Sequence, residues 1–180
     1  QTFRLMRGWP VQELRALIVA EIEPLAALAF PDAIQRMRAH QARGEQAVVV
    51  SASLADLVEP LAERLGLDAA LASRAETRDG VYTGRAESFL HGAAKADAVR
   101  RFAADREIDL AASSAYTDSR SDIELLEAVG HPYAVNPDRA LRRAASARGW
   151  PVLRFTASKL SLAEAEAALV RESNDVALPT

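Results

Sequence analysis

The sequence predicts an α/β protein with a doubly wound parallel sheet, and two observations favour this fold class. Short apolar runs that suit buried strands occur at residues 47–50, 110–116 and 133–135. Longer segments with helical periodicity separate them, and small or polar residues follow each run. Strands that alternate with helices in this way form parallel sheets, whose ligand crevice lies at the carboxyl ends of the strands.

Composition restricts the class of protein. The 180 residues are 49% hydrophobic and 26% charged, which is typical of a globular chain and not of a disordered one. A formal net charge of −3 gives no reason to expect nucleic acid as a partner. The chain has no cysteine, which excludes disulfides, thiolate metal sites and cysteine nucleophiles. No apolar run approaches the roughly 20 residues that span a bilayer.

The first 44 residues are predicted to be helical. Pro10 suits a first helical turn, and the apolar residues after it recur on one helical face. Pro24 is expected to punctuate this segment, and a further helix is predicted to end near Gly44.

The first predicted strand, at residues 47–50, leads into a turn that suits an anion. Ser51-Ala52-Ser53 follows the strand, and Ser53 with Asp56 has the spacing of a capping box, so a helix is predicted from there to Gly66. Hydroxyl and backbone N–H groups at a helix start can hold an anion. The alternative is that both serines only cap the helix, and for Ser53 we favour that interpretation.

The next segment is predicted to form a small hairpin followed by a helix. A short strand at residues 71–76 precedes the turn signal Asp79-Gly80. Lys95 then opens a helix, where a cation is electrostatically unfavourable. A partner anion would explain this lysine, although a solvated surface charge is the usual interpretation.

Two carboxylates, Asp118 and Asp122, stand four residues apart after the apolar run at 110–116. Ser121 and Glu124 have capping-box spacing, so a helix is predicted to begin at Asp122 and to end at Gly130. Asp118 would then end a strand, where two acidic groups can collect Mg²⁺. The alternative is that Asp122 only complements the helix dipole.

The remaining segments complete the α/β alternation. After the strand at 133–135, Asn136 is predicted to cap a helix that has Pro137 at its first position and ends at Gly149. A last strand is predicted at residues 152–155 and a last helix at residues 161–171. The histidines lack metal-ligand spacing. The chain has no Gly-rich phosphate loop and no G-x-S-x-G, which argues against P-loop NTPases, dinucleotide enzymes and α/β-hydrolases.

In combination, these motifs resemble motifs II, III and IV of the haloacid dehalogenase superfamily, and most of all its phosphoserine phosphatase-like subfamily IB. The resemblance covers roughly residues 30–155. The motifs that carry it are SAS at 51–53, DGVYTG at 79–84, Lys95, YTDSRSD at 116–122, AVNPD at 134–138 and GWP at 149–151.

The resemblance implies a Mg²⁺-dependent phosphomonoesterase that works through an aspartyl-phosphate. It assigns phosphoryl binding to Ser51 and the N–H of Ala52, with Lys95 as a catalytic residue that balances the phosphoryl charge. It assigns Asp118 to Mg²⁺, and Asp122 to orienting the metal's water or neighbouring groups.

The sequence departs from the family pattern at two points, one in the substrate-binding motif and one in the nucleophile motif. The resemblance also assigns substrate binding to Ser121, which takes the place of an asparagine that contacts substrate in phosphoserine phosphatases. This replacement weakens the case for phosphoserine itself. The family's nucleophile motif, D-x-D-x-T, is missing, since no two aspartates here are separated by a single residue. We therefore expect the chain to begin inside the helical cap and to be inactive alone, while its longer parent is active.

The resemblance also divides the chain. Residues 1–30 are expected to form part of a helical cap, residues 31–155 the α/β core, and residues 156–180 a C-terminal helix and tail. We expect a cytoplasmic protein whose partner is a small phosphorylated substrate, and we leave a homodimer open. Two alternatives remain: a non-catalytic module that binds phosphate ligands or a protein, and one part of a bifunctional enzyme.

Overall fold

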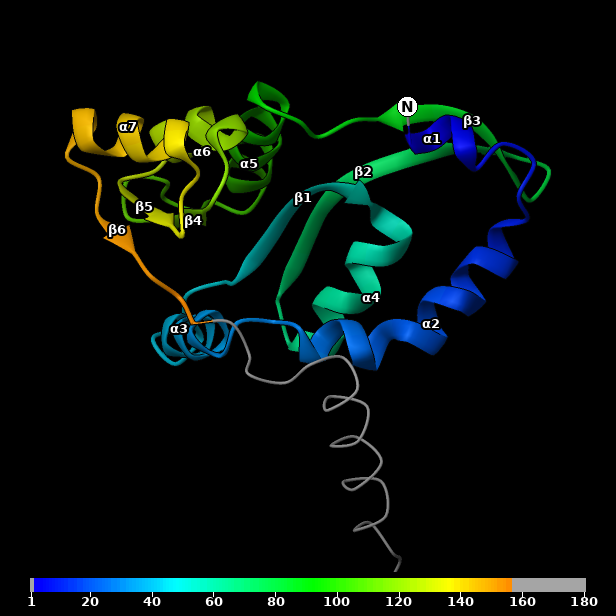
Figure 1. The fold of residues 1–180 in the computed structure, drawn as a ribbon, viewed down its shortest axis with the longest axis horizontal. Helices are drawn as coiled ribbons and strands as arrows, with labels where there is room; N and C mark the ends of the chain where they lie inside the picture. The colour runs from blue at the N-terminus through cyan, green and yellow to red at the C-terminus, as the bar shows by residue number, and fades with distance from the viewer. Residues whose placement is uncertain (1, 157–180) are drawn as a thin grey trace, which may run out of the picture.

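The computed structural model describes residues 2–156, in which helices and strands alternate as expected (Figure 1). The helices are α1 (Thr2–Leu5), α2 (Val11–Ala27), α3 (Pro31–Gln41), α4 (Ala55–Leu65), α5 (Ala93–Asp105), the 3₁₀ helix η1 (Arg120–Asp122), α6 (Ile123–Glu127) and α7 (Arg139–Arg148). The strands are β1 (Val48–Leu54), β2 (Ala69–Arg78), β3 (Val81–Ser88), β4 (Ser114–Thr117), β5 (His131–Val135) and β6 (Val152–Leu153). The predicted helix at 161–171 lies outside the described residues.

The strands form two three-stranded sheets. In one sheet β1 pairs in parallel with β2, and β2 pairs antiparallel with β3. In the other sheet β4, β5 and β6 are all parallel. The predicted α/β class with parallel strands is therefore confirmed, and among the described residues its strands are divided between two sheets. β1 and β4 are edge strands, because each pairs with a single neighbour there.

The all-parallel sheet is held by a small apolar core. Four side chains from α6, β5 and α7 are fully buried and pack together: Leu126, Ala134, Leu141 and Ala145. Each buried leucine contributes about 2 kcal/mol relative to an exposed one. This packing fixes β4 and β5 against α6 and α7, and so positions the loop that follows β4.

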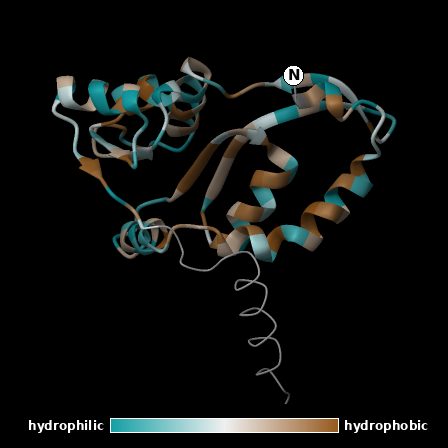
Figure 2. Cartoon of the chain, viewed as in Figure 1, coloured by the Kyte–Doolittle hydropathy of each residue, from teal (hydrophilic) through white to brown (hydrophobic). Residues whose placement is uncertain are grey.

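The mixed sheet is covered by α4, on which α2 packs in turn (Figure 1). Val58 and Ala62 on α4 and Ile18 on α2 are buried in this layer. Brown apolar residues alternate with teal polar ones along α2 (Figure 2), as expected for a helix with one buried face. The predicted hairpin is confirmed: β2 and β3 are joined through Asp79 and Gly80, both with positive φ, as a type I′ turn requires.

Three predicted helix starts are wrong. β1 continues through Ser53 to Leu54, and α4 begins at Ala55 without a side-chain cap. Ser121 does not cap α6; Ser119 caps the 3₁₀ turn before it by accepting a hydrogen bond from the Ser121 N–H. The cap of α7 is Asp138 and not Asn136. In each case the backbone stays extended, or turns tightly, for one or two residues longer than the motif implies.

Other boundaries also moved. Pro24 lies inside α2 and does not end it. The strand predicted at 110–116 begins only at Ser114, because Asp109 bends the chain: its carboxylate accepts from the Ala111 N–H and its carbonyl from the Ser113 hydroxyl. Among residues 2–156, no helix has both the length and the apolar character needed to cross a membrane.

Candidate functional site

The centre of the candidate site is a buried ion pair between Lys95 and Asp122. The Nζ atom of Lys95 donates to Oδ2 of Asp122 at 2.9 Å, and the two side chains are only 11% and 7% exposed. Removing two charges from water is costly, so such a pair persists only where further hydrogen bonds satisfy its atoms. The site supplies them on the carboxylate side.

Two hydroxyl groups complete the environment of the Asp122 carboxylate. Thr117 donates its hydroxyl to Oδ2 at 2.8 Å, and Ser121 donates to Oδ1 at 3.2 Å. Both donors come from the β4–η1 segment, so the strand end and the 3₁₀ turn hold Asp122 from two sides. The carboxylate is thus fixed in position, which suits the predicted orienting role.

Lys95 reaches this carboxylate from the first turn of α5. Gly92 precedes that helix with φ of 57°, a conformation that favours glycine, and its carbonyl accepts from the Lys95 N–H. α5 contacts both β1 and η1, so it is the element that links the two sheets at the site. The partner anion expected for this lysine is therefore Asp122.

Asp118 directly follows β4 and is exposed. Its carbonyl accepts from the Asp138 N–H at 3.0 Å, whereas its carboxylate makes no hydrogen bond or ion pair with any described residue. A hard cation prefers such a free carboxylate. Within residues 2–156 no group of three or more His, Cys, Asp or Glu side chains could hold a metal ion, so Asp118 would be the single such ligand there.

Asp138 anchors the loop that carries Asp118, although it was not predicted as a site residue. Its carboxylate accepts from the N–H of Leu141 at 2.7 Å and of Arg120 at 3.0 Å. These backbone donors, that of Leu141 first, lower the pKa of Asp138 below its usual value. One side chain therefore caps α7 and holds the 118–122 loop. The position of Asp138 directly before α7, where Asp often caps a helix, is the sequence feature that could have predicted its capping role.

Ser51 lies in the middle of β1, an edge strand of the other sheet, and is the last residue before the register irregularity. Its hydroxyl accepts from the Ser53 N–H at 3.1 Å. Ser51 pairs with Ala72 and Leu54 pairs with Ser73, so Ala52 and Ser53 have no register partner on β2. The register irregularity therefore leaves Ala52 and Ser53 outside the ladder, and no hydrogen bond between described residues joins Ser51 to Lys95 or Asp118.

Ser121, predicted to contact substrate, is engaged within the site. Its hydroxyl bonds to the Asp122 carboxylate and lies 2.9 Å from the Ser119 hydroxyl. The structure thus brings Lys95, Asp122 and Ser121 together, and Asp118 lies four residues before Asp122 on the same loop after β4.

Comparison with known proteins identifies related chains. The family model for haloacid dehalogenase-like hydrolases matches residues 1–127. The inhibition of morphological differentiation protein of Streptomyces azureus is 43% identical over 84% of this chain and 55% of its own length. A probable phosphatase of Mycobacterium tuberculosis is 43% identical over 83% of this chain and 52% of its own. The chain spans about half the length of the curated relatives it matches.

Solved structures agree on the fold. A Bordetella pertussis protein of unknown function superposes with a TM-score of 0.74 at 33% identity, over 84% of this chain and 70% of that one. A phosphoserine phosphatase captured as a phospho-aspartyl intermediate analogue superposes with a TM-score of 0.64 at 23% identity, over 92% of this chain and 73% of that one. The latter likeness concerns the fold alone.

Proposed function

Since the chain belongs to the haloacid dehalogenase-like hydrolases, we propose that it forms part of a Mg²⁺-dependent phosphomonoesterase of the phosphoserine phosphatase-like kind. The observation that carries the proposal is the buried Lys95–Asp122 pair, with an Asp118 carboxylate that has no partner among the described residues on the loop that leads to Asp122. A fixed cation together with a carboxylate that is free for a metal suits a phosphoryl group, whose charge both can offset.

Each residue has a distinct role in this proposal. Lys95, positioned by Asp122, neutralises a phosphoryl oxygen. Ser51 and the Ala52 N–H bind the phosphoryl group from the irregular part of β1. Asp118 would hold Mg²⁺, which when bound offsets negative charge on the phosphoryl oxygens and the nucleophile.

The nucleophile is proposed to come from outside this sequence, because no D-x-D motif is present. Attack by an aspartate on phosphorus would form an aspartyl-phosphate that water hydrolyses. The unpaired edges of β1 and β4 support the proposal, since an added parallel strand could pair with either edge. Val48, Val49 and Val50 on β1 are only partly buried, although such residues normally pack inside a sheet.

The proposed substrate is a small phosphorylated metabolite. Relatives include a phosphoserine phosphatase of Mycobacterium tuberculosis, 37% identical over 152 residues, and a histidinol-phosphatase of Neisseria meningitidis, 34% identical over 131 residues. Their names indicate different leaving groups, so they support the class of small phosphate monoesters and not one member of it.

The test compares this chain with a longer polypeptide that carries D-x-D-x-T ahead of Gln1. Release of inorganic phosphate from p-nitrophenyl phosphate and from a panel of small phosphate monoesters is measured with Mg²⁺ present. We expect no turnover by this chain and turnover by the longer one, reduced roughly 100-fold or more by Asp118→Asn. Asp97→Asn, which changes an exposed carboxylate on α5, is the matched control and should leave the rate unchanged.

Two outcomes would overturn the proposal. Turnover by this chain alone that survives Lys95→Ala would require a different chemistry. A longer polypeptide with an intact D-x-D-x-T that releases no phosphate from any ester of the panel would favour a non-catalytic module that binds phosphate ligands or a protein.

A further inference from the structure

An open cleft of about 910 Å³ lies between α3 and the strands β4, β5 and β6. Ser114 and His131, the first residues of β4 and β5, line it, whereas Asp118 follows the opposite, carboxyl end of β4. Neither Lys95 nor Asp122 is among its lining residues. The cleft is therefore a separate feature from the candidate phosphatase site, and its volume suits a small molecule.

The lining carries more positive than negative charge, although the whole chain is acidic. Two acidic side chains line the cleft, and both are already engaged. Glu45 bonds to Arg43 and to His40, and these contacts, that of Arg43 first, lower its pKa to about 2. Asp32 accepts a hydrogen bond from the Thr156 N–H at 2.7 Å.

Two guanidinium groups in the cleft remain without a carboxylate. Arg36 and Arg154 line it, and neither forms an ion pair with any residue between 2 and 156. A guanidinium group has five donors in a planar fork that matches phosphate oxygens, and it stays charged at any relevant pH. Two such groups facing one cleft suit an anion better than a neutral ligand.

Aromatic side chains hold Arg36 in place. Its guanidinium carbon lies 5.6 Å from the ring centre of Tyr116, 6.0 Å from that of Tyr133 and 5.9 Å from that of Phe155. The two tyrosine rings stack at 4.8 Å, and His40 bonds to the Tyr116 hydroxyl at 2.8 Å. Cation–π contacts restrain a cation without using its N–H donors. Arg36 is thus preorganised, and its N–H donors bond to no side chain or backbone group between residues 2 and 156.

We propose that this cleft binds the phosphate group of a small molecule, with Arg36 and Arg154 as its ligands. The same chemistry is presented by free inorganic phosphate and by a phosphate monoester. The site is independent of the proposed phosphatase activity, because it shares none of the residues assigned to that activity.

Histidine NMR resonances can locate the binding directly. The chain has three histidines; His40 and His131 line the cleft, whereas His91 precedes α5 near the candidate phosphatase site. Inorganic phosphate is titrated into the protein, and the imidazole signals are followed by long-range ¹H–¹⁵N correlation at constant pH and ionic strength. We expect saturable shifts of His40 and His131, whereas His91 reports any phosphate at the other site.

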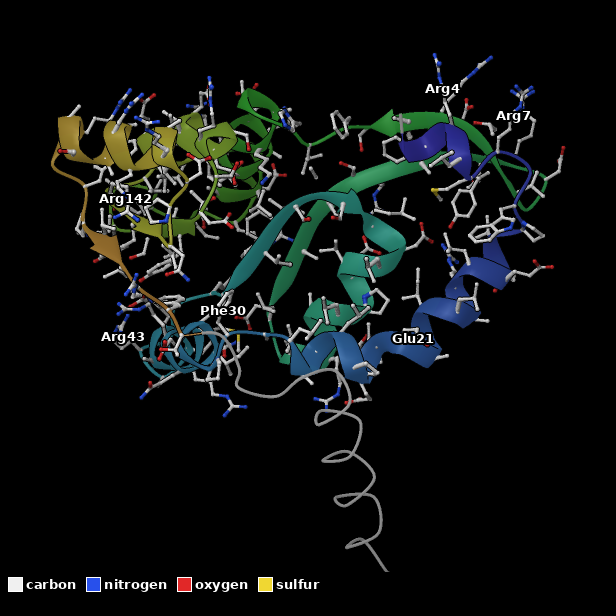
Figure 3. The ribbon with its side chains drawn as sticks, viewed as in Figure 1. Arg4, Arg7, Glu21, Phe30, Arg43 and Arg142 are labelled. Carbon is white, nitrogen blue, oxygen red and sulfur yellow. The ribbon has the colours of Figure 1, made fainter. Side chains whose placement is uncertain are left out.

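Arg154→Gln is the decisive variant, because Arg154 is exposed and forms no hydrogen bond or ring contact with other described residues, so its loss should not disturb folding. It should weaken the phosphate affinity read from His40 and His131 roughly 10-fold or more. Arg142→Gln removes the same charge from α7, where Figure 3 labels this residue. Arg142 is not among the lining residues of the cleft, so the variant should leave the affinity unchanged.

Three results would overturn the proposal. Shifts confined to His91 would place phosphate only at the other site, and shifts that never saturate would indicate no site at all. Equal weakening by Arg154→Gln and Arg142→Gln would show a general charge effect. The NMR titration measures phosphate binding and not turnover. Its outcome therefore does not depend on whether the phosphatase proposal holds.

Discussion

The Nζ atom of Lys95 lies 2.9 Å from Oδ2 of Asp122, across 27 residues of sequence and inside the protein. This contact joins α5 to the turn that follows β4. Because both side chains are buried, each depends on the other for compensation of its charge. The pair therefore matters for folding as well as for the proposed chemistry.

Asp122→Asn should destabilise the protein by about 3 kcal/mol, because it leaves the Lys95 ammonium buried without a counter-charge. The free energy of unfolding is measured by urea denaturation near neutral pH. Asp97→Asn breaks the exposed pair with Arg100 on the same helix and should cost less than about 1 kcal/mol. Similar costs for the two variants would show that the Lys95–Asp122 pair is solvated in solution.

Asp138→Asn should lower stability in a pH-dependent way. Backbone donors lower the pKa of Asp138 in the folded state, so its stabilising contribution is fully present above the unfolded pKa, about 4, and is lost as pH falls through the folded pKa. Urea denaturation is compared for wild type and variant from pH 7 down to about pH 3. The difference in unfolding free energy should shrink toward acid; a constant difference would contradict the assigned cause.

Much of the fold could be predicted because local patterns determine it. The Asp79-Gly80 hairpin, the helix opened by Lys95 and the glycine ends of α4 and α7 all follow from short-range backbone preferences. The sequence analysis also expected an anion near Lys95, because a cation at a helix start is unfavourable. It could not select Asp122 as that anion, since their proximity depends on how α5 packs.

Features that depend on long-range packing could not be predicted. The caps at Ser53 and Asn136 were wrong because β1 ends in a register irregularity and because Asp138 is better placed to accept from Leu141. The division into two sheets could not be predicted, because the hydrophobic periodicity of a sequence does not indicate which strands are neighbours. The cleft lined by Arg36 and Arg154 joins segments more than a hundred residues apart.

Gly130→Ala should destabilise the protein by at least about 2 kcal/mol, because a Cβ atom there would lie 1.7 Å from the Ala111 carbonyl oxygen. Gly130 was predicted as a helix stop, but α6 ends at Glu127, and close approach to Ala111 is what requires glycine. Urea denaturation checks the prediction. In Gly44→Ala the new methyl group meets nothing within 4 Å, so only backbone strain of about 1 kcal/mol is expected. A smaller cost at Gly130 than at Gly44 would refute the argument.

Asp118→Asn should abolish a weak divalent-cation site without affecting stability. The Asp118 carboxylate is exposed and has no partner among residues 2–156, so its charge stabilises nothing there and is free to bind a hard cation. With a single protein carboxylate, Mg²⁺ binding by this chain should be weak.

Mn²⁺ is a paramagnetic substitute that shares the preference for oxygen ligands. It should broaden the amide NMR signals of Ser119 and Arg120 at low stoichiometry, and Mg²⁺ should reverse the effect. Asp118→Asn should remove this broadening, whereas Asp97→Asn should retain it. Broadening that persists unchanged in Asp118→Asn would place the cation elsewhere and remove the metal role proposed for this residue.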